Sequence, residues 1–444
     1  MAFHPPPSIV DEPPASDGDW TGIQQRPQGG AAPGRRGPTV SVGGGAASSA
    51  ATIRRPTCAS ELPRCRAAAR ATTLEDRIRL VAWPILLSCF PPEAELPFAP
   101  ERLMQQRQYA AFGAMFCGRL DATDNPDVDR RKIDADVPRT MRSLHFFSND
   151  QPTPQDETER GPGGHGEGRA ASHAAGAASR PSPATTAPPT YTTNQMALRR
   201  ALHIFVGLNP GVGYVQGMNE IMGLLLVVFS GDGRRQAGLE EEADAFFCFQ
   251  AILKEIRDYY CRALDDDVST GLTSAFQRFT AMLFVLDDAL AAHLQRIELV
   301  PAYYVMRWVT LMFAQEFDVP DTIVIWDFVL SFCPEGKMID ILLTFAVTMV
   351  ISVRESLLQM DFPTAMTFLQ AYPRTIDVRM LIRAAAKNFD DVLGVTPAAD
   401  ASSTQFGSVS SAATAFASKS LQLASQATER GRQWLVTAFA GGSS

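Results

Sequence analysis

The stretch Val206–Phe229 constrains the fold most strongly, because a glycine-rich segment leads there into an unbroken apolar run. Its sequence is VGLNPGVGYVQGMNEIMGLLLVVF. A run such as Ile221–Phe229, apolar at every position, predicts a helix that is buried on all sides. Hydrophobic residues make up 45% of the 444 residues, which is ample for the large core that such a helix requires.

The glycine-rich half of this stretch has two interpretations. Four glycines surround Pro210: Gly207, Gly211, Gly213 and Gly217. A phosphate-binding loop would explain them, but their spacing misses the dinucleotide fingerprint, and no Lys-Ser/Thr pair follows to make a P-loop. The alternative is a structural turn into a core helix, because Gly and Pro commonly punctuate structure. Tyr214, Gln216 and Asn219 lie where this turn meets the core, a place that can hold a side chain rigidly against a partner.

Charge, cysteine usage and hydropathy narrow the class of protein. The net charge of −8 argues against a general nucleic-acid binder, which would show a basic stripe. Seven scattered cysteines without a C-x-x-C pair favour reduced thiols in the cytosol over a disulfide framework or a zinc site. The N-terminus lacks the pattern of a secretory signal, and the longest uncharged apolar run, Ile341–Val353, is too short to span a bilayer. We therefore expect a soluble, cytoplasmic protein.

Composition divides the chain into one folded domain and three low-complexity segments. Residues 1–70 are rich in Pro, Gly, Ala and Ser, and we expect them to form a disordered tail. The domain is expected over residues 71–395, with Thr72 and Glu75 forming a capping box before its first helix. Residues 149–192 interrupt the domain, and we expect a disordered surface loop there.

The Ser/Ala-rich segment 396–444 carries apolar residues at helical spacing from residue 406 to residue 439. One explanation is a disordered tail with chance periodicity, or a helix that packs on the domain. The other is an amphipathic helix that lies at a membrane surface and gives the protein a peripheral contact with endomembranes.

Apolar residues at three- and four-residue spacing predict helices through the rest of the domain, and no segment shows a strand pattern with confidence. The predicted helices are Leu103–Phe116, Ala243–Leu264, Leu272–Leu294, Asp361–Tyr372, Thr375–Phe389 and one that opens at Pro301 and contains RWVTLMFAQEF. His293 is interpreted as an ordinary residue of a helix surface. The predicted fold class is all-α, in two lobes, because a core beyond about 300 residues tends to split.

The segment KIDADVPRT, which runs from Lys132 to Thr140, is the second one of interest. Pro138 disfavours a helical conformation at Val137, so a helix is expected to start here with Asp136 as its N-cap. Asp136 and Arg139 lie three residues apart and can be neighbours on a helix. Taken alone, this pattern indicates a surface ion pair at a helix start.

Five segments in order resemble motifs of the TBC domain, the GTPase-activating domain that acts on Rab-type small GTPases. They are RLVAWPILLSCFP, KIDADVPRT, YVQGMNEI, RWVTLMFAQEF and VIWDFVL. Ile133, Asp136 and Arg139 match the family's arginine-finger motif Ile-x-x-Asp-x-x-Arg, and YVQGMNEI matches its glutamine-finger motif. The segments DAFFCFQAILKEIRDYYCRALDD, SVRESLLQMDF and LQAYP are close to the subgroup of family member 13. The resemblance spans roughly residues 71 to 390.

The resemblance implies a mechanism in which this chain completes the catalytic site of a partner. Arg139 would be an arginine finger, since a planar guanidinium supplied in trans can accelerate GTP hydrolysis by roughly 10³–10⁵-fold. Gln216 would be a glutamine finger that takes over water positioning from the GTPase. The partner would be a Rab-family GTPase in its GTP-bound form, which carries the GTP and Mg²⁺, so the chain needs no cofactor of its own.

Supporting roles follow from the same resemblance. Asp136 would orient Arg139, Tyr214 would brace the loop, Gly217 would allow close approach of the partner, and Asn219 would hold the backbone. Four further residues would support the groove floor and are structural rather than catalytic: Arg307, Trp308, Glu316 and Asp327. Two alternatives from other classes are a non-catalytic module that binds a Rab, and a membrane-tethering scaffold.

Overall fold

The computed structural model describes eight parts of the chain: residues 62–72, 74–90, 99–118, 128–148, 191–231, 233, 235–260 and 271–393. Every regular element within them is a helix, and they contain no β-strand. The predicted all-α fold class is therefore confirmed. The segment 1–61, the insertion up to residue 190 and the proposed tail helix at 406–439 lie outside the described residues. None of the described helices is long and apolar enough to cross a membrane.

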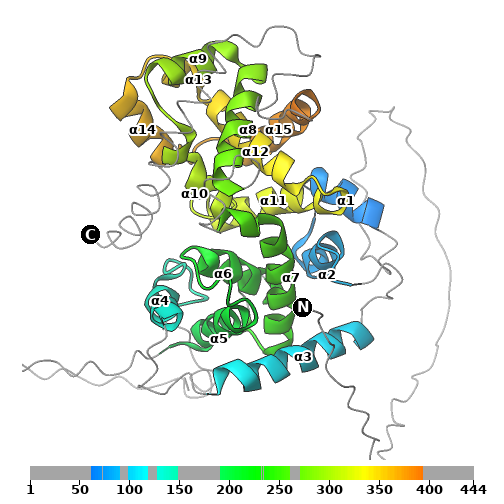
Figure 1. Ribbon diagram of the computed structural model, residues 1–444. Helices are drawn as coiled ribbons and strands as arrows, with labels where there is room; N and C mark the ends of the chain where they lie inside the picture. The colour runs from blue at the N-terminus through cyan, green and yellow to red at the C-terminus, as the bar shows by residue number, and fades with distance from the viewer. Residues whose placement is uncertain are drawn as a thin grey trace, which may run out of the picture. The chain divides into compact units, whose positions relative to one another are not determined.

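A first group of helices packs around α5 and α7 (Figure 1). It contains α3 (Ala99–Cys117), α4 (Val128–Asp136), the 3₁₀ turn η2 (Val137–Arg139), α5 (Thr193–Leu208), α6 (Met218–Phe229), α7 (Leu239–Ile256) and the 3₁₀ turn η3 (Arg257–Tyr259). Every residue of α6 is buried, which confirms the prediction of a helix enclosed on all sides. Helix α5 begins with a capping box, because the Thr192 side chain accepts from Gln195 N and the Gln195 side chain accepts from Thr192 N.

A second group packs around α12 (Met338–Ser352), which lies against α8, α10 and α15. Its other members are α8 (Gly271–Leu286), α9 (Asp288–Arg296), η5 (Pro301–Tyr303), α10 (Val305–Thr310), α13 (Arg354–Leu357), α14 (Phe362–Gln370) and α15 (Val378–Val392). The remaining elements are α1 (Leu62–Arg70), α2 (Asp76–Leu86), α11 (Val319–Leu330) and η6 (Cys333–Glu335), of which α2 and α11 join the groups. Helix α2 contacts α6 and α7 of the first group as well as α11, and α11 contacts α12 and α15. The two groups correspond to the two predicted lobes.

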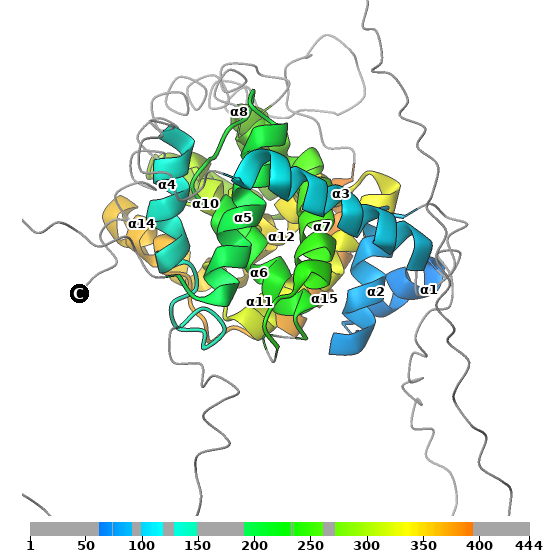
Figure 2. The ribbon, with the colours of Figure 1, turned by 90° about the horizontal axis from the view of Figure 1, so that it is seen from below.

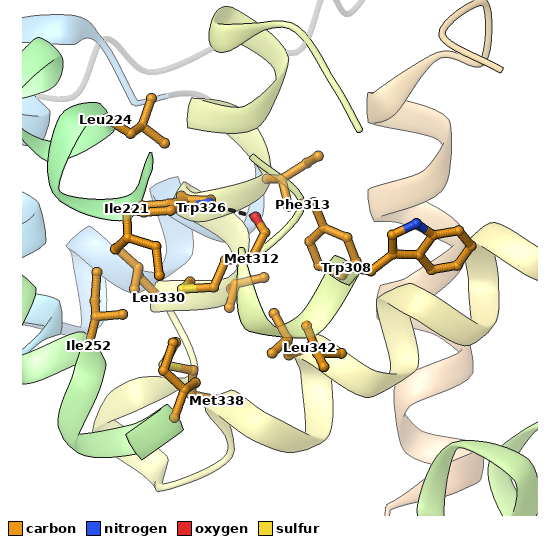
Figure 3. Packing of buried hydrophobic residues seen from close by; sticks show 14 of the residues in the cluster. Ile221, Leu224, Ile252, Trp308, Met312, Phe313, Trp326, Leu330, Met338 and Leu342 are labelled. Carbon is orange, nitrogen blue, oxygen red and sulfur yellow. Dashed lines mark hydrogen bonds between the residues drawn. The ribbon is translucent and has the colours of Figure 1, made fainter. Parts of the chain in front are cut away.

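Figure 3 shows the apolar core where the groups meet, with Trp326 beside Ile221 of α6. The predicted helix through RWVTLMFAQEF is interrupted, because α10 ends at Thr310. Met312 and Phe313 then have positive φ angles of 47° and 64°, which side chains disfavour. The Trp326 indole nitrogen donates to the Met312 carbonyl oxygen at 2.9 Å and so fixes this turn.

The helical domain begins earlier in the sequence than the predicted start at residue 71. Helix α1 lies within the expected disordered tail, and its Arg66 and Arg70 form ion pairs with Glu335. The Arg70 guanidinium also stacks over the Phe332 ring at 4.0 Å. These contacts are far apart in sequence, so the local composition of the segment did not indicate them.

Some helices begin or end at other residues than predicted. The predicted helix Leu272–Leu294 is two helices, because the Asp287 side chain accepts from Leu290 N and caps α9. Thr72 is not a cap, since α2 begins at Asp76. His293 was interpreted as a surface residue, but it is buried, and its Nε2 lies 3.1 Å from the Met360 carbonyl oxygen.

The ion pair between Arg79 and Asp327 joins α2 to α11 in the interior. Arg79 Nη2 lies 2.9 Å from Asp327 Oδ2, and the Trp83 indole nitrogen donates to Asp327 Oδ1 at 2.8 Å. Burial raises the pKa of Asp327 to about 6, although Arg79 and Trp83 favour its charged form.

Arg79→Ala should lower the free energy of unfolding by about 3–5 kcal/mol, because it leaves the Asp327 carboxylate buried without its cation. The double variant Arg79→Met/Asp327→Leu should recover part of this loss, since no unpaired charge remains buried, while the Trp83 indole nitrogen loses its acceptor. Urea unfolding of the three proteins measures both effects. A single variant as stable as the wild type would show that this ion pair does not fix α2.

Candidate functional site

Arg139 is the exposed last residue of a 3₁₀ turn that follows α4. The helix predicted to begin at Pro138 does not form, because α4 ends at Asp136 and Val137–Arg139 continue it as a single tighter turn. Pro138 fits the start of this turn, where a missing N–H costs no hydrogen bond. The side chain of Arg139 is exposed and makes no hydrogen bond to any residue that the structure describes.

Gln216 lies half-buried in the loop that connects α5 to α6. The loop is tightened by the Asn209 carbonyl oxygen, which accepts from Val212 N and Gly213 N at 3.0 Å each. It ends at Gly217, whose φ of +106° is in a region that side chains disfavour. A Cβ atom at Gly217 would lie 2.3 Å from Leu311 Cδ2, so the close approach that the structure shows is to the chain's own core.

A buried hydrogen-bond network joins the two loops. The Tyr214 hydroxyl lies 2.8 Å from Asp136 Oδ2 and 3.0 Å from Asn219 Oδ1. Asn219 Oδ1 also accepts from Gly217 N at 3.0 Å, and Asn219 Nδ2 donates to Thr140 Oγ1 at 3.0 Å. Thr140 Oγ1 in turn donates to the Asp136 carbonyl oxygen at 3.0 Å.

This network fixes the backbone on both sides of each candidate finger. Asp136 and Thr140 flank Arg139, whereas Tyr214 and Gly217 flank Gln216. The network thus brings together the four supporting residues that the resemblance assigned to these loops: Asp136, Tyr214, Gly217 and Asn219. Asp136 holds Tyr214 by a hydrogen bond and acts on Arg139 only through its charge.

Two buried carboxyl groups give the site an unusual electrostatic setting. Burial raises the pKa of Asp136, while the hydrogen bond from Tyr214 and the charge of Arg139 act in the opposite direction. Burial and the nearby Asp136 raise the pKa of Glu220 to about 7. Glu220 was not among the candidate residues, although a carboxyl group at the start of an apolar run is the signal that could have indicated it.

The four residues assigned to the groove floor hold the helices together. Arg307 donates through two nitrogens to the Glu316 carboxylate, at 2.6 Å and 2.8 Å, and to the Gln370 carbonyl oxygen at 2.7 Å. Trp308 is fully buried and packs edge-on against Tyr304. Asp327 belongs to the ion pair between α2 and α11 described above.

Comparison with known proteins shows which family of domains this chain is similar to. Residues 179–358 match the family model described as the Rab-GTPase-TBC domain. The matched segment includes Gln216 and begins after Arg139. The structure agrees in fold with the crystal structure of the Ypt/Rab-GAP domain of Gyp1p, with a TM-score of 0.53, 17% identity, and coverage of 74% of this chain and 92% of that chain.

Among individual proteins, the chain is similar to mouse TBC1 domain family member 13. The identity is 40% over 188 residues, which cover 42% of this chain and 46% of that protein. The GTPase-activating protein gyp1 of Schizosaccharomyces pombe is 24% identical over 209 residues, which cover 43% of this chain and 40% of that protein. The chain thus spans slightly less than half the length of these relatives.

The raised pKa of Glu220 predicts a loss of stability as the pH increases. The folded protein binds this proton more tightly than the unfolded chain, whose Glu has a pKa of about 4.5. The free energy of unfolding should therefore fall between about pH 4.5 and pH 7 and level off above the folded pKa.

Glu220→Gln should remove this contribution of Glu220, which amounts to about 3 kcal/mol for a shift of this size. Urea unfolding of both proteins at pH 5 and pH 8 measures it. Equal pH dependence in the two proteins would show that Glu220 does not titrate in this range.

Proposed function

We propose that this chain accelerates GTP hydrolysis by a Rab-family GTPase. The observation that carries the proposal is one buried network that holds Asp136 and Thr140, on either side of the exposed Arg139, together with the loop of Gln216. Arginine and glutamine are the side chains that this reaction needs, one to neutralise charge on the phosphate oxygens and one to aim the attacking water.

The rigidity of the site supports a catalytic role. A group that stabilises a transition state must be held in place before the reaction, because ordering it during the reaction would cost free energy. The Thr140 and Asn219 side chains provide this order through buried hydrogen bonds that leave Arg139 itself free to reach outward. GTP and Mg²⁺ would arrive on the GTP-bound partner, and the chain would contribute only side chains.

The relatives support the same activity and leave the target open. The names of the S. pombe protein and of the Gyp1p domain describe GTPase activation and Rab-GAP function. We propose that this chain acts in the cytoplasm near endomembranes that carry Rabs. A non-catalytic Rab-binding module is disfavoured because both finger residues are present in the network's loops. A tethering role would rest on residues 396–444, which the structure does not describe.

Arg139→Lys should remove most of the acceleration, because lysine keeps the charge and loses the planar fork. The full effect of an arginine supplied in trans is roughly 10³–10⁵-fold. Thermal melting should stay at the wild-type level, since Arg139 is exposed. Rab binding should persist, since lysine keeps the positive charge. Single-turnover GTP hydrolysis, with the most responsive member of a purified Rab panel, measures the rate.

Arg383→Lys is the matched control, because Arg383 is also exposed and lies in α15 of the second group. A near-wild-type rate in the Arg139 variant, or an equal loss in both variants, would contradict the assignment of Arg139 as the arginine finger.

A further inference from the structure

Helix α4 presents two carboxylates to the loop that carries Gln216. Asp129 lies in its first turn and Asp136 at its end. Residues seven apart complete about two turns, so both side chains lie on the same face of the helix. Figure 2 shows this helix alongside α5, which leads directly into the loop.

Both carboxylates bind the same residue of the loop. Asp129 Oδ2 accepts a hydrogen bond from the backbone N–H of Tyr214 at 3.1 Å. Asp136 Oδ2 lies 2.8 Å from the Tyr214 hydroxyl. The backbone of Tyr214 and the tip of its side chain are thus held by two separate points of one helix, and Gln216 follows two residues later.

The glycine at position 213 permits the first of these contacts. Gly213 has a φ of +67°, and a Cβ atom there would lie 2.6 Å from Asp129 Oδ2. A side chain at this position would therefore displace the carboxylate from the Tyr214 amide. The glycine at position 213 is therefore explained by the Asp129 carboxylate of the same chain.

We propose that Asp129 is a positioning residue for the Gln216 loop, so that α4 sets the place of both fingers. The same helix runs directly into the turn of Arg139, and its first turn fixes the loop of Gln216. This inference rests on the proposed GTPase-activating function for its catalytic consequence, but the contact between Asp129 and the loop does not.

Two substitutions can distinguish the hydrogen bond that Asp129 accepts from the effect of its negative charge. Lys132 pairs with the other carboxylate oxygen, at 2.9 Å, and this pair is half-exposed. Asn keeps an oxygen that can accept from Tyr214 N, whereas Ala has no acceptor. Asp129→Asn should therefore retain the position of the loop, and Asp129→Ala should lose it.

Hydrogen–deuterium exchange of the full chain tests the contact without any GTPase. Peptides that cover residues 209–217 should exchange about tenfold faster in Asp129→Ala and at the wild-type rate in Asp129→Asn. Asp288→Ala is the matched control, because Asp288 is an exposed aspartate in the first turn of α9. Unchanged exchange in Asp129→Ala would overturn the proposal even if the chain activates a Rab.

Steady-state kinetics with a responsive Rab test the catalytic consequence. Asp129→Ala should lower kcat about tenfold with KM nearly unchanged, and Asp129→Asn should restore kcat. In a Gln216→Ala background, Asp129→Ala should cause no further loss, because the glutamine that it positions is gone. A loss of the same factor in that background would overturn the role assigned to Asp129. If the wild-type chain activates no Rab, the proposed function fails while the exchange result still decides the contact.

Discussion

The arrangement of the site depends on the Tyr214 hydroxyl, which is buried between Asp136 and Asn219. A buried polar group without partners costs about 1–3 kcal/mol, so each member of this network favours the one geometry in which all are satisfied. That geometry fixes the turn of Arg139 against the loop of Gln216. The position of the Arg139 turn relative to the Gln216 loop is therefore set by buried contacts. Little of the backbone at these two positions has to become ordered when a partner binds.

The network in turn depends on the way α6 is enclosed. Gly217 leads into α6, and the loop at this point packs against Leu311, which follows α10. Leu311 precedes the turn that Trp326 fixes through Met312. The loop of Gln216 therefore packs at Gly217 against Leu311 of the second group. A site carried by the first group thus depends on packing in the second group as well.

Local patterns in the sequence predicted most of the helices. Contacts between residues far apart in the sequence determined where several helices begin and end. The unbroken apolar run predicted α6, because burial on all sides leaves a pattern in one segment. The contact between Asp129 and the Tyr214 backbone could not be predicted, since these residues are far apart in sequence. Helix α1 was missed because its ion pairs are with Glu335. Gly217 was expected to allow the close approach of a partner. In the structure, the atom that leaves no room for a side chain at this position belongs to Leu311.

The central claim is that Arg139 and Gln216 act in trans as one preorganised unit. Its most direct test is single-turnover GTP hydrolysis by a Rab whose own switch glutamine has been replaced by alanine. Wild-type chain should still accelerate this reaction, and Gln216→Ala should not, because it has no glutamine to aim the water. A switch-glutamine variant that does not respond to the wild-type chain, while the unmodified Rab does, would contradict the account.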